Sequence, residues 1–269
     1  MNALALPASR RTAIAAAVVA AAGLALAACG GSGGSNTGSG SAAAASKPAS
    51  SHSSPSSGST AAVSANSLPF PVGVGDTWTY ATSDVAGTTG TVVDKMTAVT
   101  PVSGGQQVTM DGTITNEGIS TSNTAYYIFH SDGSITLPFS QFNTSSSSSD
   151  VKLISGTLAW PSASGLAAGQ GSTSTLQIQF TINGQSQNVT ATITVKGAGT
   201  QSVTVPAGSY NATVVDMTMS ETVENIPVSD TVTTWLAPDV GPVKTQVMLD
   251  EAGNDTVAGT QELTSFVQG

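Results

Sequence analysis

The stretch Leu176–Val195, LQIQFTINGQSQNVTATITV, decides the fold class of this chain. Apolar and polar residues alternate on both sides of Asn183-Gly184, and a period of two indicates β-strands. Asn-Gly is the preferred pair for a two-residue type I′ hairpin turn. This turn predicts three cross-strand pairs: Ile182 with Gln185, Ile178 with Val189, and Leu176 with Ala191. The apolar side chains of both strands then share one face, whereas a slip of one residue would send one set to the other face.

A second hairpin is predicted around Asp132-Gly133, because Asp-Gly also favours a two-residue turn. The same reasoning places His130 and a set of apolar side chains on one face of its strands: Tyr126, Ile128, Ile135, Leu137 and Phe139. Gly, Pro and Asn mark further turns at 103–105, 206–208, 238–242 and 253–254. The sequence thus predicts a series of antiparallel hairpins.

Short alternating runs rich in Thr and Val continue from Leu68 onward, and no window shows a helical period with caps. Residues 162–171 contain too much Gly for a helix, and Pro227 interrupts 220–229. We therefore predict a mostly all-β domain: a large curved antiparallel sheet, half-barrel or sandwich-like, with about ten to twelve strands and few or no helices. Its apolar face must be covered by another part of the same sheet or by a ligand.

The N-terminal 28 residues have the three parts of a secretory signal. A head with Arg10 and Arg11 precedes an apolar run from Ala13 to Leu26 and small residues before Cys29. The apolar run is shorter than the roughly 20 residues that cross a bilayer. Export through the general secretory route and export through the twin-arginine route both remain open, since Ser9–Thr12 only faintly resembles a twin-arginine motif.

Leu26-Ala27-Ala28-Cys29-Gly30 resembles the lipobox of bacterial lipoproteins. This resemblance implies that a signal peptidase cuts before Cys29 and that acyl chains on this residue anchor the protein to a membrane. One acyl chain binds only marginally, but two or three together make a lasting anchor. A signal peptide that contains a cysteine by coincidence is the alternative.

We divide the chain into a lipoprotein signal peptide (1–28), a Gly/Ser/Ala-rich disordered tether (29–66) and an antiparallel β domain (67–269). The tether cannot bury enough apolar area to offset its ordering entropy, and its root-mean-square reach is roughly 30 to 37 Å. The β domain divides at a serine run into parts 67–143 and 151–269 that resemble each other loosely. A diverged duplication and a coincidence both explain that likeness.

The charge balance excludes one class of partner. Removal of the signal leaves five lysines and 16 acidic residues, a formal net charge of −11. Nucleic-acid binding depends on cationic contacts to phosphates, so we expect no nucleic-acid partner. Adhesion to anionic lipid headgroups is disfavoured for the same reason. With its one cysteine acylated, the chain has no disulfide and must be held together by its core.

No residue cluster predicts a reaction, a metal site or a cofactor. His130 and Asp132 lie together at a hairpin tip, where a rim residue and a turn aspartate explain them. Ser149–Lys152 matches S-x-x-K and Gly30–Gly34 matches G-x-S-x-G, but both lack the helix that these motifs need. The acidic residues near Asp250 lack the spacing of a calcium loop. We expect no catalytic residues, no metal ligands and no cofactor.

Three segments resemble landmarks of a family of uncharacterised bacterial envelope proteins: Val74–Tyr80 (VGDTWTY), Val205–Tyr210 (VPAGSY) and Thr234–Lys244 (TWLAPDVGPVK). Their domain is similar in outline to the LolA and LppX lipid carriers, in which a curved antiparallel sheet forms half a barrel. The resemblance implies a concave apolar face. Those carriers close the face with helices, which this sequence does not predict. From the residues alone, the landmarks are turns and packing positions.

Two functions follow as alternatives. The first is a lipid-anchored lipoprotein of the cell envelope that binds a lipid or other hydrophobic ligand on its curved sheet. The residues predicted for that face are Tyr126, Ile128, Leu176, Ile178, Phe180, Val189 and Ile193. The second is a structural or protein-interaction module with a self-filled core and an envelope protein as partner. An enzyme is not expected. The anchor would lie on the outer face of the cytoplasmic membrane or in the outer membrane.

Overall fold

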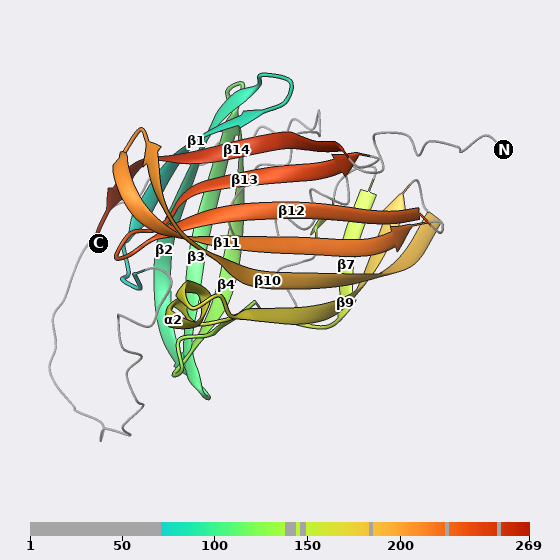
Figure 1. Cartoon of the computed structure of the whole chain (residues 1–269), viewed down its shortest axis with the longest axis horizontal. Helices are drawn as coiled ribbons and strands as arrows, with labels where there is room; N and C mark the ends of the chain where they lie inside the picture. Colours follow the sequence, from blue (N-terminus) through green and yellow to red (C-terminus); the bar gives the residue numbers. More distant parts are fainter. Residues whose placement is uncertain (1–70, 138–143, 146–148, 183–184, 224–225, 252–253) are drawn as a thin grey trace, which may run out of the picture.

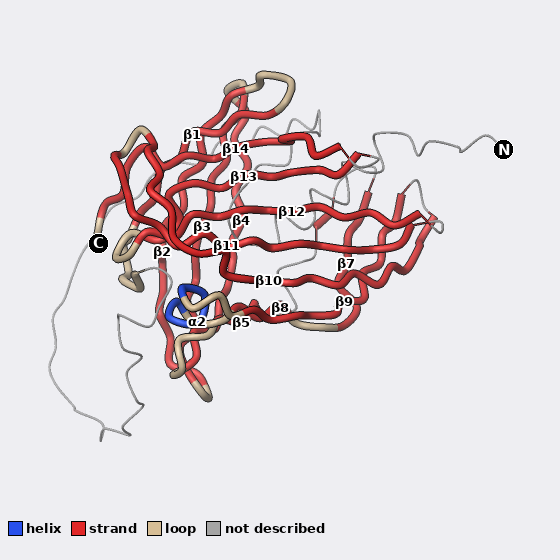
Figure 2. Tube along the Cα trace, in the orientation of Figure 1, coloured by secondary structure: helices blue, strands red, loops and turns tan. Residues whose placement is uncertain are grey.

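The computed structural model describes residues 71–137, 144–145, 149–182, 185–223, 226–251 and 254–269. In these residues the chain forms fourteen strands of one antiparallel sheet and one short helix (Figure 2). The elements are β1 (Thr77–Asp84), β2 (Thr89–Val102), β3 (Gly105–Asn116), β4 (Ile119–His130), β5 (Ile135–Leu137), β6 (Thr144–Ser145), β7 (Ser149–Ser155), β8 (Leu158–Trp160), α2 (Ala163–Ala167), β9 (Gly171–Ile182), β10 (Gln185–Val205), β11 (Gly208–Val223), β12 (Ile226–Ala237), β13 (Gly241–Glu251) and β14 (Asn254–Val267). The predicted all-β class is confirmed, with somewhat more strands than the ten to twelve expected.

The sheet covers its own apolar face by bending over. Its strand order is β6-β7-β9-β10-β11-β12-β13-β14-β1-β2-β3-β4-β5-β8, so the last strand pairs with the first. Figure 1 shows β10 to β14 side by side in one layer, with β2, β3 and β4 crossing behind them. Crossed layers of one sheet enclose a core between their inner faces. Both predicted parts, 67–143 and 151–269, contribute strands to this sheet, and their duplication stays a prediction.

The hairpin of β9 and β10 has the predicted register. Ile182 pairs with Gln185, Ile178 with Val189, and Leu176 with Ala191. Leu176, Ile178 and Val189 are all buried, and the polar residues between them make cross-strand hydrogen bonds on the outer face. The turn residues 183–184 lie outside the described part of the chain.

The predicted face of the hairpin of β4 and β5 is wrong. Phe129 pairs with Ile135, because the loop has three residues, closed by a bond from the His130 N–H to the Ser134 carbonyl. Gly133 adopts φ +79° there, as in a type I turn followed by a left-handed residue. The three-residue loop shifts the pairing by one residue from the predicted register, so Phe129 lies opposite Ile135 and shares its buried face. Tyr127 and Phe129 are therefore buried, while Tyr126 is 36% exposed.

β8, the last strand of the sheet order, lies beside β9, the third strand from the other end. β7 pairs with the second half of β9, and Gly156, at φ +105°, redirects the chain into β8, which pairs with β5. The Ala159 N–H donates to Ser174 Oγ at 3.3 Å, and Ser172 Oγ donates to the Ala159 carbonyl. These hydrogen bonds join serine side chains of β9 to the backbone of β8. They hold the two strands side by side without backbone pairing between them.

A short helix, α2, follows β8 where the glycine content argued against any helix. Ser162 caps it by accepting a hydrogen bond from the Gly165 N–H, as N-cap serines commonly do. Leu166 is fully buried and fixes the turn against β10, where Gly197 leaves room for the Leu166 carbonyl. The expectation for residues 162–171 was therefore wrong for these five residues, because burial of one leucine outweighs the poor helix propensity of Gly165.

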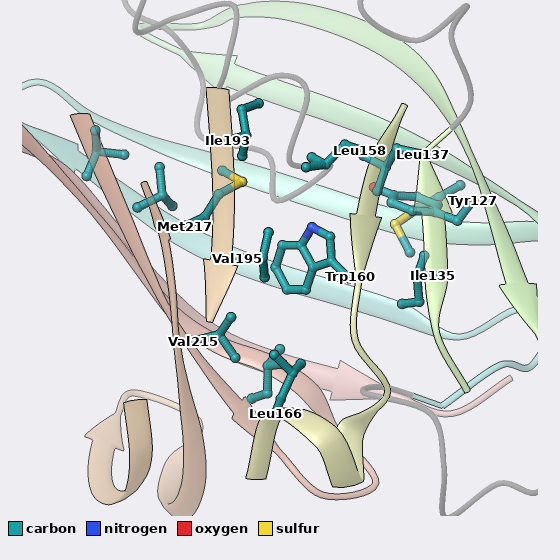
Figure 3. Packing of buried hydrophobic residues seen from close by; sticks show 14 of the residues in the cluster. Tyr127, Ile135, Leu137, Leu158, Trp160, Leu166, Ile193, Val195, Val215 and Met217 are labelled. Atoms are coloured by element: carbon teal, nitrogen blue, oxygen red, sulfur yellow. The ribbon is translucent and has the colours of Figure 1, made fainter. Parts of the chain in front are cut away.

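The core between the layers is made of the chain's own side chains. Trp160 pairs with Ile135, and its ring points toward Val195 of the opposite layer (Figure 3). The largest side chains that are less than 2% exposed come from both layers and from α2: Trp78, Phe129, Met96, Leu137, Leu153, Leu158, Leu166, Leu176, Ile193, Met217, Met219 and Leu263. The interior is thus packed from both sides.

Candidate functional site on the buried face of the sheet

The structure divides the residues predicted to face a ligand. Leu176, Ile178, Val189 and Ile193 lie on the inner face, between 1% and 5% exposed. Tyr126 and Ile128 lie on the opposite face of β4, for the reason given above. The side chain of Phe180 lies outside the described part, as do Cys29 and the other lipobox residues, Leu26, Ala27, Ala28 and Gly30. The set therefore does not form one surface.

The three landmark segments meet at one corner of the molecule. Trp78 Nε1 donates to the Val240 carbonyl at 2.6 Å, and Tyr80 Oη donates to the Pro242 carbonyl at 3.1 Å. The N–H of Ala207 donates to the Leu263 carbonyl on β14, the neighbour of β1. Gly241 at φ +93° and Asp239 at φ +61° shape the turn that presents these carbonyls. The landmark segments thus connect strands that are distant in the sequence. This agrees with their interpretation as turns and packing positions.

The start of β1 adds a buried carboxylate to this corner. Asp76 is 1% exposed, and its Oδ1 accepts a hydrogen bond from the Gly269 N–H at 2.9 Å. Gly75, at φ +104°, precedes it and donates to the Met96 carbonyl. The chain therefore turns just before β1, as expected for a landmark segment that contains a turn. Through its hydrogen bond with Gly269, Asp76 also links the end of β14 to the start of β1.

Polar side chains cross the inner face in one row. Thr234 of β12 pairs with Thr245 of β13, Thr245 with Gln261 of β14, and Gln261 with Thr82 of β1. Thr234, Thr245 and Gln261 are 1 to 2% exposed, and Gln261 Oε1 has no hydrogen-bond partner in the described part of the chain. A strictly apolar ligand face would not contain such a row. Sequence alternation could have revealed it, because these residues occupy inward positions beside Leu236, Val243 and Leu263.

A second buried polar group, Asp94, lies among aromatic residues. It pairs with Trp78 on β1 and with Gly112 on β3, where a Cβ on the glycine would come within 3.0 Å of Asp94 Oδ1. Burial raises the pKa of Asp94 to about 7. Burial, and then the nearby Asp94 charge, raise the pKa of Tyr80 and Tyr127 above the usual range. Perturbed carboxyls of this kind often mark functional sites.

The hairpin tip around His130 has the structure of a turn. His130 Nε2 lies 2.8 Å from Thr136 Oγ1, and Asp132 Oδ1 accepts hydrogen bonds from the Ser134 hydroxyl and N–H. These bonds to Ser134 lower the pKa of Asp132. His130 and Asp132 thus each bond to a different neighbour. The described residues bring no three His, Cys, Asp or Glu side chains together as metal ligands, and they contain no helix with the length and hydrophobicity of a membrane span.

The outer face is polar and paired with itself. Thr, Ser, Gln and Asn side chains on neighbouring strands bond to one another, as in Thr113 with Ser122 and Thr204 with Ser209. Trp235 also lies on this face: its Nε1 donates to Gln201 Oε1 at 2.8 Å, and Lys244 Nζ lies 5.7 Å from its ring. Lys244 in turn pairs with Glu262 at 2.8 Å. The face opposite the core is therefore a polar surface of Thr, Ser, Gln and Asn side chains.

Known proteins resemble this chain in sequence family and in fold. The family described as DUF3108-like matches residues 74–263. A crystal structure of a "putative lipoprotein" from Parabacteroides distasonis has 17% identity and a TM-score of 0.54, covering 75% of this chain and 99% of that one. A "putative exported protein with YmcC-like fold" from Bacteroides fragilis has 17% identity and a TM-score of 0.52, covering 75% and 100%. No curated protein matches the chain. The likeness to the LolA and LppX carriers stays a prediction.

Proposed function

The chain belongs to the DUF3108-like family, and from this premise we propose that it is an exported, lipid-anchored lipoprotein of the bacterial cell envelope. The lipobox Leu26–Gly30 supports an anchor at Cys29. The fold is shared with proteins named "putative lipoprotein" and "putative exported protein", which supports an envelope location. In this proposal acyl chains hold the protein to the membrane and the tether separates the β domain from it.

We propose further that the β domain is a non-enzymatic structural or protein-interaction module with an envelope protein as partner. The observation that carries this is the burial of the predicted ligand face. Leu176 and Ile193 are each 1% exposed because the chain's own atoms cover them. An acyl chain could reach them only if the two layers separated, which would expose the core. Binding of a hydrophobic ligand is therefore the competing proposal, and it requires such an opening.

Metabolic labelling tests the anchor. Cells that express the full chain are grown with radiolabelled palmitate, and we expect label in the wild-type protein and none in Cys29→Ala. Ser32→Ala is the matched control, since it changes a neighbouring small residue without touching the thiol, and it should label like the wild type. Label retained in Cys29→Ala, or an unlabelled precursor in the cytosol, would contradict the proposal.

Uptake of a fluorescent fatty acid tests the module. We expect the purified full chain in detergent to show no saturable binding above that of a detergent blank. Saturable uptake would favour the ligand-binding alternative if Leu176→Trp weakens it and the control Thr190→Trp leaves it unchanged. Thr190 lies on the outer face of the neighbouring strand. For the interaction role we expect a separate result: cross-linking in cells should recover the same envelope protein in repeated experiments.

A further inference from the structure

The row of polar residues Thr234, Thr245, Gln261 and Thr82 contains one atom, Gln261 Oε1, that lacks a hydrogen-bond partner in the described part of the chain. Its members are nearest neighbours on four adjacent strands, and directly paired side chains have Cβ atoms about 4.5 to 5.5 Å apart. Gln261 Oε1 is buried without a hydrogen-bond partner in the described residues. Most buried polar groups in proteins form a hydrogen bond to another protein group or to an ordered water molecule. Buried polar groups without any partner are costly and rare.

The row also leads toward the surface. Thr82, at its β1 end, is half-buried, and its partner on β2 is Gly90. The side chain of Asn116 lies over Gly90, at a position that any larger residue would occupy. Asn116 is half-buried as well. Polar groups therefore continue from the half-buried end of the row to the fully buried Thr234, and this continuity distinguishes the row from a single misplaced polar residue.

We propose that this row is an internal hydration site, in which ordered water molecules bridge Gln261 Oε1 to the hydroxyls of Thr245 and Thr234. A water molecule buried in a protein usually makes about three hydrogen bonds, which these adjacent groups provide. Water both donates and accepts, so it matches an amide beside hydroxyls without any charge. The Thr82 and Asn116 end gives the route of exchange with solvent.

Isosteric removal of the polar atoms tests the site. In the full chain in detergent, we expect Thr245→Val and Gln261→Met each to lower the melting temperature by about 2 to 4 °C, because each takes a partner from the bound water. Gln246→Met is the matched control, since Gln246 precedes Val247 on the outer face of β13. We expect it to leave the melting temperature unchanged. A melting temperature that rises in Thr245→Val and Gln261→Met would show that these groups are unpaired in a dry core and would overturn the proposal.

Magnetic relaxation dispersion of the solvent water gives a second measurement. It detects long-lived internal water molecules directly, which a melting temperature does not. The wild-type chain should show long-lived internal water, and Gln261→Met should show less of it, whereas Gln246→Met should match the wild type. Equal amounts in all three proteins would also overturn the proposal, because the row would then hold no exchangeable water of its own.

Discussion

At the residue scale, Asp94 makes stability depend on pH. Its folded-state pKa of about 7 lies above the ordinary 3.8 because burial disfavours the charged form. Below about pH 4 the carboxyl is protonated in both the folded and the unfolded state, and its full contribution to stability is present. As the pH rises from there through 7, the unfolded state loses this proton first and the contribution is lost. The free energy of unfolding falls by about 1.4 kcal/mol for each unit of difference between the two pKa values. We expect Asp94→Asn to unfold later than the wild type at pH 8 and together with it at pH 4, in chemical denaturation. Asp111→Asn, an exposed change on the outer face of the same sheet, is the control. A wild-type advantage at pH 8 would contradict the assignment.

At the element scale, hairpin loops decide which face of a strand is buried. The sequence predicts a two-residue loop for both hairpins; the register of β9 and β10 agrees with it, whereas β4 and β5 are joined by a three-residue loop. The reason is local: Asp132 accepts bonds from Ser134, and Gly133 takes a left-handed conformation, which together favour a three-residue loop. An alanine at φ +79° costs roughly 1 to 2 kcal/mol. We expect Gly133→Ala to lower the melting temperature by several degrees and the neighbouring Ser131→Ala to leave it nearly unchanged, as followed by circular dichroism. Equal melting of both variants would contradict this account of the loop.

At the scale of the whole molecule, long-range hydrogen bonds hold the bent sheet together. Tyr80 Oη reaches the Pro242 carbonyl, 162 residues away, inside the core. Removal of a buried hydrogen bond commonly costs about 1 to 3 kcal/mol when the acceptor is left unpaired. We expect Tyr80→Phe to lower the free energy of unfolding by this amount. Tyr210→Phe should cost far less, because the Tyr210 hydroxyl is half-buried and bonds only three residues away at 3.5 Å. Similar losses in the two variants, measured by denaturant titration, would contradict the account.

The sequence was enough to predict the all-β class, the β9 and β10 register and the polar outer face, because each depends on local alternation. It was not enough to predict that the apolar face is covered by the sheet itself. That outcome depends on the crossing of β2 to β4 behind β10 to β14 (Figure 1) and on the bonds from Ser172 and Ser174 to Ala159. These contacts join residues that no local pattern connects. Alternation within each strand places Thr234, Thr245 and Gln261 at inward positions, but only the pairing of β12, β13, β14 and β1 brings them together in one row.

We propose that the β domain fills its core with its own side chains and holds no lipid there. Native mass spectrometry can test this on the full acylated chain, released from detergent micelles after purification from bacterial membranes. We expect one mass, that of the mature polypeptide with the acyl groups on Cys29. A second mass, heavier by a noncovalently bound lipid and lost on gentle activation, would contradict it.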